Sequence, residues 1–272
     1  MKKERVDVLA VQQGISDSRE KAKRLIMAGE IYDQNQQRLD KPGVKISSDS
    51  VLHQKGNPLP YVSRGGLKLA KALDVFEIDL TDQNVLDIGS STGGFTDVAL
   101  QNGASHCYAL DVGTNQLVWK LRNDERVTVM EQTNFRYSQP DDFTLGQPDV
   151  AVTDVSFISL RLIFPPLRPI LKQEGAVVAL IKPQFEAGRE LVGKKGIVHD
   201  PKIHCHVIEQ TFQMAMANGY DVCGLTYSPI TGGEGNIEFL GYFRNEQHEV
   251  GQMAADISIE AVVSEAHGTF TN

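Results

Sequence analysis

Apolar and polar positions alternate with two different periods from about Ser63 onward. Short continuous apolar runs predict buried strands at residues 84–88, 105–110, 127–130, 150–153, 176–181, 222–227 and 237–242. Between them, helical spacing predicts helices at residues 65–75, 92–102, 117–122, 159–171 and 201–217. This alternation indicates an α/β fold, a Rossmann-like doubly wound and mostly parallel sheet whose last two strands form an antiparallel hairpin at one edge. Ligands of such sheets bind beyond the carboxyl ends of the strands.

The first sixty residues have a different pattern, typical of a small α+β domain. Helices are expected at residues 5–14 and 17–28, the second capped by Ser16 and closed by Gly29. Strand-like pieces follow at residues 31–32, 44–46 and 51–52, and two prolines and a glycine at residues 56–60 mark a boundary. We therefore expect domains at residues 1–60 and 61–245, followed by a docked helical tail at 246–272.

Composition narrows the class of protein. The net charge is −8, yet residues 1–60 hold eleven Lys/Arg against eight Asp/Glu. A locally basic segment can bind nucleic acid even in an acidic protein, although a solvated basic helix is the alternative. No apolar run approaches the roughly 20 residues of a membrane span, and the charged N-terminus does not resemble a signal peptide. Together with three scattered cysteines, these features predict a cytoplasmic protein without a membrane partner.

A metal centre is not expected. The string His204-Cys205-His206 contains three potential ligands in a row. Adjacent residues on a helix point about 100° apart, so the three side chains cannot easily close on one ion. We interpret the string as an ordinary part of the helix at residues 201–217.

The loop after the first predicted strand reads Asp87-Ile-Gly-Ser-Ser-Thr-Gly-Gly-Phe95. Its glycines and serines let a ligand approach the backbone, and the helix that follows offers unpaired N–H groups. Such a loop alone is also compatible with a nicotinamide dinucleotide. However, the pattern is not G-x-G-x-x-G, and the carboxylate of Asp87 would repel a pyrophosphate while suiting a ligand that carries an ammonium group.

The ends of the next two strands complete a cofactor site. Asp111 ends the second strand, where a carboxylate can accept two hydrogen bonds from a ribose diol. Glu131 and Asn134 follow the third strand and could meet an adenine edge, or have no ligand at all. We predict S-adenosyl-L-methionine as the cofactor, bound by Asp87, Gly89, Ser90, Ser91, Thr92, Gly93, Gly94, Phe95, Asp111, Val112, Glu131, Asn134 and Asp154.

The residues after the fourth and fifth strands narrow the choice of methyl acceptor. Amino-directed enzymes carry Asn/Asp-Pro-Pro-aromatic after the fourth strand and carbon-directed cytosine enzymes need Pro-Cys, but this chain has neither there. A hydroxyl acceptor remains, and it needs a base. Lys182 could serve if burial and neighbouring positive charge lower its pKa. Lys68 could supply that charge, Asp154 could orient Lys182, and Glu238 could hold a lysine in place, although Lys68 and Glu238 alone would be ordinary surface residues.

These four residues resemble a known catalytic set. In chain order and strand position, Lys68, Asp154, Lys182 and Glu238 match the Lys-Asp-Lys-Glu tetrad of ribose 2′-O-methyltransferases of the FtsJ type. The motifs at residues 63–69, 87–95, 154–160 and 182–188 resemble the TlyA family, also called haemolysin A, and the resemblance extends to about Arg244. It implies 2′-O-methylation of cytidine in the RNA of one or both ribosomal subunits.

A second resemblance concerns the basic N-terminal domain. Residues 18–29, followed by Lys41-Pro42-Gly43, are similar to the RNA-binding module first known from ribosomal small-subunit protein S-four. In that family the basic face of the second helix lies against the RNA backbone, a contact that positions the protein without reading sequence. The resemblance implies phosphate contacts by Arg5, Arg19, Lys23 and Arg24. Further RNA-contact candidates are Arg64 and, in a polar loop that is either a lid or simply mobile, Lys194 and Lys195.

Two other functions are alternatives to this prediction. The haemolysin name suggests a membrane-lysing toxin, which predicts a secretion signal or a strongly amphipathic membrane segment, and the sequence contains neither. A non-catalytic RNA chaperone or ribosome assembly factor would use the basic domain alongside a decayed enzyme domain. The intact set of four catalytic candidates argues against decay.

Overall fold

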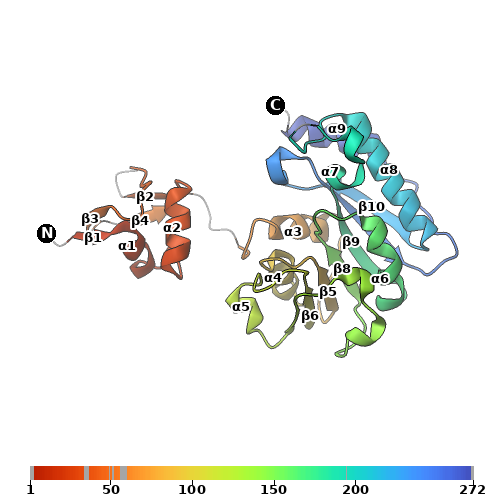
Figure 1. Cartoon of the computed structure of the whole chain (residues 1–272), viewed down its shortest axis with the longest axis horizontal. Coiled ribbons are helices and arrows are strands. Elements are labelled where there is room, and N and C mark those ends of the chain that lie inside the picture. Colours follow the sequence, from red (N-terminus) through yellow and green to blue (C-terminus); the bar gives the residue numbers. More distant parts are fainter. Residues whose placement is uncertain are drawn as a thin grey trace. The chain divides into compact units, whose positions relative to one another are not determined.

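The computed structural model describes residues 3–33, 37–48, 50, 52–55, 60–193 and 195–270. Its internal contacts divide the chain into two compact units, residues 1–60 and 61–272 (Figure 1). Most of the boundary expected at residues 56–60 lies outside the described part, as does Val51 of a predicted strand. Among the helices that the structure describes, none combines the length and the apolar character that a membrane span requires.

The N-terminal unit packs two helices against two small antiparallel sheets. In chain order its elements are β1 (Lys3–Arg5), α1 (Val6–Gln12), α2 (Arg19–Met27), β2 (Ile31–Asp33), β3 (Lys45–Ser47) and β4 (Leu52–Gln54). Strand β1 pairs with β3, and β2 pairs with β4. Their apolar faces meet in a core of Val6, Leu9, Ala10, Ala22, Ile26, Ile31 and Leu52.

Two predictions for this unit are wrong. Arg5 belongs to strand β1, so the first helix begins at Val6. The cap of α2 is Ser18 and not Ser16, because the extended backbone at Ser18 lets its side chain accept a hydrogen bond from the Lys21 amide. Ser16 instead donates its hydroxyl to the Ser18 carbonyl. The helix therefore starts two residues later than predicted.

The larger unit is built on a seven-stranded sheet of order β10-β11-β9-β8-β5-β6-β7. Its strands are β5 (Asn84–Ile88), β6 (His106–Leu110), β7 (Val127–Met130), β8 (Val150–Thr153), β9 (Gly175–Ile181), β10 (Asp221–Tyr227) and β11 (Phe239–Asn245). Strands β5 to β9 are parallel, whereas β11 runs antiparallel between β9 and β10. This confirms the predicted α/β class, the mostly parallel sheet and the antiparallel pair at one edge.

Helices cover both faces of this sheet (Figure 1). One apolar cluster joins the sheet to α3 (Gly66–Val75), α4 (Gly94–Gln101) and α5 (Trp119–Arg122). The other joins it to α6 (Phe164–Ile170), α8 (Pro201–Ala217) and α9 (Ile259–Phe270). The remaining short elements are α7 (Pro183–Glu186), η1 (Phe135–Tyr137), η2 (Pro140–Asp142), η3 (Leu160–Leu162), η4 (Arg189–Leu191) and η5 (Gly233–Gly235). Because successive strand residues face opposite sides, each buried strand contributes to both clusters.

Two helix predictions differ from the structure for identifiable reasons. The single helix expected at residues 159–171 is divided into η3 and α6. Pro165 and Pro166 lie in the first turn of α6, where a missing backbone N–H costs no helical hydrogen bond, so a new helix can begin there, and Pro169 lies inside the same helix. In the C-terminal tail the helix starts only at Ile259, whereas Met253 forms a bridge with Val222 of β10. Helix α9 packs on α8 and β10, as a docked tail helix would.

Candidate active site

Two adjoining cavities open at the carboxyl ends of the parallel strands. The first, which we call the tetrad cavity, has a volume of about 570 Å³ and is lined by Lys68, Asp154, Lys182 and Glu238 together with the loop after β5. The second, which we call the adjoining cavity, measures about 440 Å³ and lies at the ends of β6 and β7. Gly89, Ser91, Asp154, Ser156 and Phe157 line both cavities, so these form one continuous cleft.

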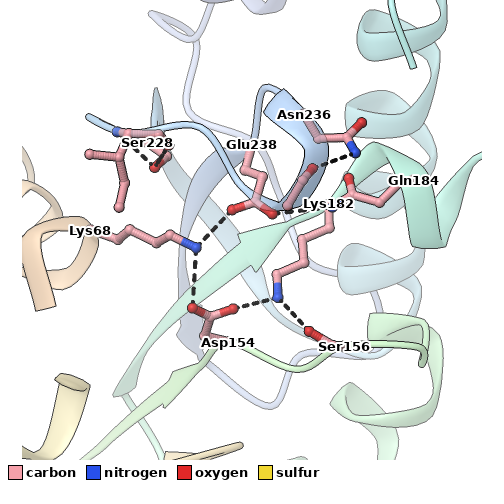
Figure 2. A network of polar contacts seen from close by, with 10 residues as sticks. Lys68, Asp154, Ser156, Lys182, Gln184, Ser228, Asn236 and Glu238 are labelled. Carbon is pink, nitrogen blue, oxygen red and sulfur yellow. Dashed lines mark hydrogen bonds and ion pairs between the residues drawn. The ribbon is translucent and has the colours of Figure 1, made fainter. Parts of the chain in front are cut away.

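The four tetrad candidates, which are far apart in sequence, form one network of ion pairs (Figure 2). Lys68 Nζ lies 2.8 Å from Glu238 Oε2 and 3.3 Å from Asp154 Oδ2. Lys182 Nζ lies 2.5 Å from Asp154 Oδ1 and donates a 3.0 Å hydrogen bond to Ser156 Oγ. Asp154 thus bridges the two lysines. Two ammonium groups and two carboxylates balance one another in a largely buried setting, where an unpaired charge would be costly.

The sheet topology explains why these residues meet. Asp154 directly follows β8 and Lys182 directly follows β9, and parallel neighbours end at the same edge of a sheet. Glu238 directly precedes β11, which is antiparallel to β9, so its start lies beside the end of β9, with Phe239 opposite Ile181. Lys68 comes from the first turn of α3.

Lys68 has the environment of a permanently charged group. Burial lowers the pKa of Lys68, but the charges of Asp154 and Glu238 outweigh burial, and the pKa is raised overall. This environment keeps Lys68 positively charged beside Asp154. The other oxygen of Glu238 accepts a 3.1 Å hydrogen bond from Gln184 Nε2, so both carboxylate oxygens are engaged.

The glycine-rich loop approaches the tetrad closely. Gly89 and Gly93 have φ values of +87° and +97°, a left-handed conformation that side chains rarely adopt. A Cβ atom on Gly89 would lie 3.1 Å from the Asp154 carbonyl oxygen, and one on Gly94 would lie 2.3 Å from Ser63 Oγ. Gly93 caps α4, where a Cβ would collide with Leu121. These positions need glycine because the loop backbone packs closely against its neighbours, and Gly89 and Gly94 also line the tetrad cavity.

Asp87 contributes a buried acceptor below this loop. Its Oδ2 accepts hydrogen bonds from the Thr96 amide and hydroxyl, at 3.0 and 2.7 Å. Its Oδ1 is buried and has no hydrogen-bond partner among the residues that the structure describes. Burial, reinforced by the charges of Asp154 and Asp111, raises the pKa of Asp87 to about 7 against the hydrogen bonds from Thr96. A ligand carrying an ammonium group would satisfy this oxygen, which is the fit expected for an amino-acid-bearing cofactor.

The other predicted cofactor residues divide into two groups. Asp111, Val112 and Asn134 line the adjoining cavity. Asp111 accepts backbone hydrogen bonds from Ser91 (2.8 Å) and from Gly113 (2.7 Å), so it also fixes the loop after β5. Ser90, Ser91, Thr92 and Phe95 line the tetrad cavity.

Glu131 has a different environment. Its carboxylate accepts hydrogen bonds from three consecutive backbone amides, those of residues 115–117, and from Arg122. Although burial raises the pKa of Glu131, these bonds lower it to about 2. Glu131 therefore anchors the loop after β6, which forms the wall of the adjoining cavity.

An aromatic pair marks the mouth of the cleft and was not predicted from the sequence. Phe157 is 91% exposed, adopts a φ of +62° and lies 5.0 Å from the ring of Phe185. Glu186 fixes the segment by accepting hydrogen bonds from Ser159 Oγ (2.6 Å) and the Leu160 amide (2.8 Å). An exposed, strained phenylalanine beside a polar cavity indicates a binding surface more than a core position.

The predicted RNA contacts differ in their availability. Asp7, which is buried, pairs with Arg5 at 2.9 Å and Arg19 at 3.0 Å. The hydrogen bonds from Arg5 hold the pKa of Asp7 at about 2, with help from Arg19 and against burial. Lys23 pairs with Glu20. Arg24 is exposed on α2.

In the larger unit, Arg64 and Lys195 are both exposed, and Lys195 lines the tetrad cavity. Lys194 lies outside the described residues. Within the described ranges, no group of three or more His, Cys, Asp or Glu side chains has a metal-binding arrangement. His204 of the string at residues 204–206 is instead buried in α8 and hydrogen-bonded.

Comparisons with known proteins agree with this geometry. The family model described as FtsJ-like methyltransferase matches residues 61–245. YqxC of Bacillus subtilis, which has a provisional rRNA methyltransferase name, is 60% identical over 98% of this chain and 95% of its own. The 16S/23S rRNA (cytidine-2′-O)-methyltransferase TlyA of Mycobacterium tuberculosis is 39% identical over 89% of this chain and 90% of its own.

Among solved structures, a provisionally named hemolysin from Streptococcus thermophilus is 56% identical, with a TM-score of 0.79, and covers 100% of this chain and 98% of its own. The family match spans more than half of the chain and contains all four tetrad residues. This chain belongs to the FtsJ-like methyltransferase family.

Proposed function

We propose that this protein transfers a methyl group from S-adenosyl-L-methionine to the ribose 2′-hydroxyl of a cytidine in ribosomal RNA. The observation that carries the proposal is the largely buried network of Lys68, Asp154, Lys182 and Glu238. It lies beside a glycine-rich loop and a buried Asp87 oxygen that has no hydrogen-bond partner among the described residues. The names of the relatives TlyA and YqxC support ribosomal RNA as the substrate, and that of TlyA supports the cytidine 2′-hydroxyl.

Residues of both cavities would hold the cofactor. Asp87 Oδ1 would accept the ammonium group of its amino-acid part, and the glycine loop would contact that part through backbone N–H groups. Asp111 would bind the ribose diol and Asn134 the adenine edge, from the adjoining cavity. When bound, S-adenosyl-L-methionine supplies a methyl group on a positively charged sulfur.

Lys182 would act as the base at the other side of the cleft. A 2′-hydroxyl in the tetrad cavity would lie within reach of Lys182 Nζ, which would take its proton as a neutral amine, after the ammonium group has released its own proton to solvent. Asp154 is placed to hold the resulting ammonium group, since its Oδ1 already lies 2.5 Å from Nζ. Lys68 and Glu238 would keep Asp154 oriented, so positioning would supply much of the rate enhancement.

Two further regions would bind the RNA. The exposed ring of Phe157, packed against the half-buried ring of Phe185, offers a surface on which an unstacked base can lie at the mouth of the cleft. Residues 1–60 would act as an S-four-type RNA-binding domain, with Arg24 as its most available phosphate contact, alongside Arg64, Lys194 and Lys195. Residues 61–245 would be the catalytic domain and residues 246–272 a helical tail.

Labelled methyl transfer tests the function directly. Purified protein is incubated with methyl-labelled cofactor and with ribosomal RNA or subunits from a strain that lacks the gene, and the modified ribose is mapped. We expect label on the 2′-oxygen of a cytidine. Absence of incorporation into every form of this RNA would refute the proposal. Liposome leakage that persists in Lys182→Ala would support a lytic function instead.

A further inference from the structure

Asn236 joins two loops over the tetrad cavity. Its side chain is 3% exposed, and its amide group is fully used. Oδ1 accepts the Val198 amide at 3.0 Å, while Nδ2 donates to the carbonyl oxygens of Gly196 (2.9 Å) and Gly233 (3.1 Å). The segments 195–198 and 232–236 therefore meet at this one side chain.

The loops held by Asn236 form the wall next to Glu238. Gly196, Gly232, Gly233 and Asn236 itself line the tetrad cavity. Gly232 lies directly against the Glu238 carboxylate, since a Cβ atom there would be 2.1 Å from Oε1. Figure 2 shows Asn236 beside Glu238 on the same loop. Any shift of residues 232–236 would therefore displace Glu238 or open space around it.

A chain of hydrogen bonds continues from this wall to the C-terminal helix. The Val198 carbonyl accepts from His204 Nε2 at 3.0 Å, and His204 Nδ1 lies 3.0 Å from His267 Nε2 on α9. Burial lowers the pKa of His204 to about 4, so its ring is neutral near pH 7 and has one N–H group. A carbonyl can only accept, so that N–H must be on Nε2, and His267 must then be the donor to Nδ1.

From these contacts we infer that Asn236 is a positioning residue for the RNA-side wall of the tetrad cavity, and that α9 supports the same wall through His267, His204 and Val198. The inference rests on the proposed function only in assigning this wall to the RNA acceptor. Helix α9 lies beyond the residues that the family model matches. The C-terminal tail would then contribute to the reaction without touching the substrate.

The substitution Asn236→Asp tests the first part. It keeps the size of the side chain but replaces the donor Nδ2 by an oxygen facing two carbonyl oxygens, which would repel it. We expect kcat for RNA to fall about tenfold to a hundredfold, the scale of small misplacements at a reacting site, with cofactor affinity unchanged. In the full-length protein, hydrogen exchange of the amides in residues 195–200 and 230–236 should become faster.

Asn245 provides a matched control. It is also a buried asparagine whose Nδ2 donates to carbonyl oxygens, those of Arg168, Leu171 and Lys172, but it lies at the opposite end of β11. Asn245→Asp should lower the melting temperature while kcat and exchange in the two loops stay within about twofold of wild type. If the two variants lose stability alike and Asn236→Asp keeps its kcat, Asn236 is only structural and the inference is overturned.

The second part is tested at His267, which is half-buried and tolerates substitution better. His267→Phe keeps the ring contact with His204 but removes the donor, and should change kcat and loop exchange in the same direction as Asn236→Asp. His267→Gln keeps an N–H donor and should restore both. Loss of thermal stability alone in His267→Phe would contradict a role for α9. If wild-type protein does not methylate ribosomal RNA, the proposed function fails, but the exchange measurements still decide this inference.

Discussion

The two sides of the cleft hold charge in different ways. On the tetrad side, four charged side chains from four separate segments neutralise one another, and the described contacts engage both oxygens of Asp154 and of Glu238. On the glycine-loop side the surface is mainly backbone, and the buried Asp87 has one oxygen engaged by Thr96 and one without a partner among the described residues. The charges on the tetrad side are paired with one another, whereas the Asp87 carboxylate on the glycine-loop side has one oxygen left for a ligand.

The proposed function accounts for this difference by what each side would bind. A small cofactor can bring its own positive charge, so a buried acceptor without a partner becomes a specific contact once the ligand arrives. An RNA hydroxyl is neutral and must give up a proton, so the charges that assist it have to be balanced within the protein beforehand. The comparison predicts that substitutions on one side leave binding on the other side nearly unchanged.

The largest effect is expected for Lys182→Ala. Removing the base should lower kcat by about a hundredfold to ten-thousandfold, the usual contribution of general base catalysis, while cofactor affinity changes less than about twofold. Single-turnover methyl transfer and cofactor titration measure the two quantities. Lys172→Ala, which removes a surface lysine paired with Asp149, serves as the control. Loss of cofactor binding in Lys182→Ala would show that the two sides are not independent.

The second-largest effect is expected at Phe157, which lines both cavities. Phe157→Ala removes an exposed ring and should weaken RNA binding by about 1–3 kcal/mol, the range for stacking of one base. That corresponds to about fivefold to 150-fold in the dissociation constant for RNA. Trp119→Ala changes another exposed aromatic, on α5, and should have no such effect. An unchanged RNA affinity in Phe157→Ala would exclude the stacking surface.

Cofactor binding on the glycine-loop side should depend on pH. The pKa of Asp87 is about 7 in the free protein, and a bound ammonium group favours the ionised carboxylate. Cofactor affinity should therefore rise as pH increases toward 7 and level off above it, with a slope on the acid side of up to about tenfold per pH unit. Calorimetry between pH 5.5 and 8.5 measures this. Asp87→Asn should weaken binding and flatten the profile; an unchanged slope would assign the titration to another group.

The smallest effect concerns the N-terminal unit, which belongs to neither side. Arg24→Gln should weaken RNA binding modestly and reduce the slope of log affinity against log salt by about 0.7–0.9, the value for one phosphate contact. Arg24 is a cleaner choice than Arg19, whose loss would leave the buried Asp7 with fewer partners. Arg38→Gln, at a position paired with Asp40, is the control. Equal salt slopes for wild type and Arg24→Gln would remove Arg24 from the interface.

Much of the larger unit could be predicted from the sequence because buried parallel strands are continuous apolar runs. Strands β5, β7 and β8 have the predicted bounds, and Asp154 and Lys182 meet because each directly follows a strand of the same sheet. The start of α2 could not be predicted as well, since Ser16 and Ser18 are equally good caps by residue type and only the backbone conformation decides.

The contacts made by several side chains between the strands could not be predicted from the sequence. Ser156, Gln184 and Asn236 each contact the tetrad or its wall through a side-chain direction that no periodicity encodes. The position of Glu131 after a strand predicts an adenine contact, whereas in the structure its carboxylate is engaged by backbone amides. For Ser156 and Gln184 the available signal was their place next to Asp154 and Lys182 in the motifs.

The antiparallel direction of β11 affects how this protein can evolve. In a purely parallel sheet, every strand ends at the ligand edge and none begins there. Here β11 is antiparallel, so it begins at that edge. The connection from β10 to β11 therefore reaches the ligand edge, with Glu238 at its end. Insertions or deletions between residues 228 and 236 could reshape this wall of the tetrad cavity without altering strand pairing. Substrate choice could thus diverge in this hairpin while the methyl-donor side of the cleft stays constant.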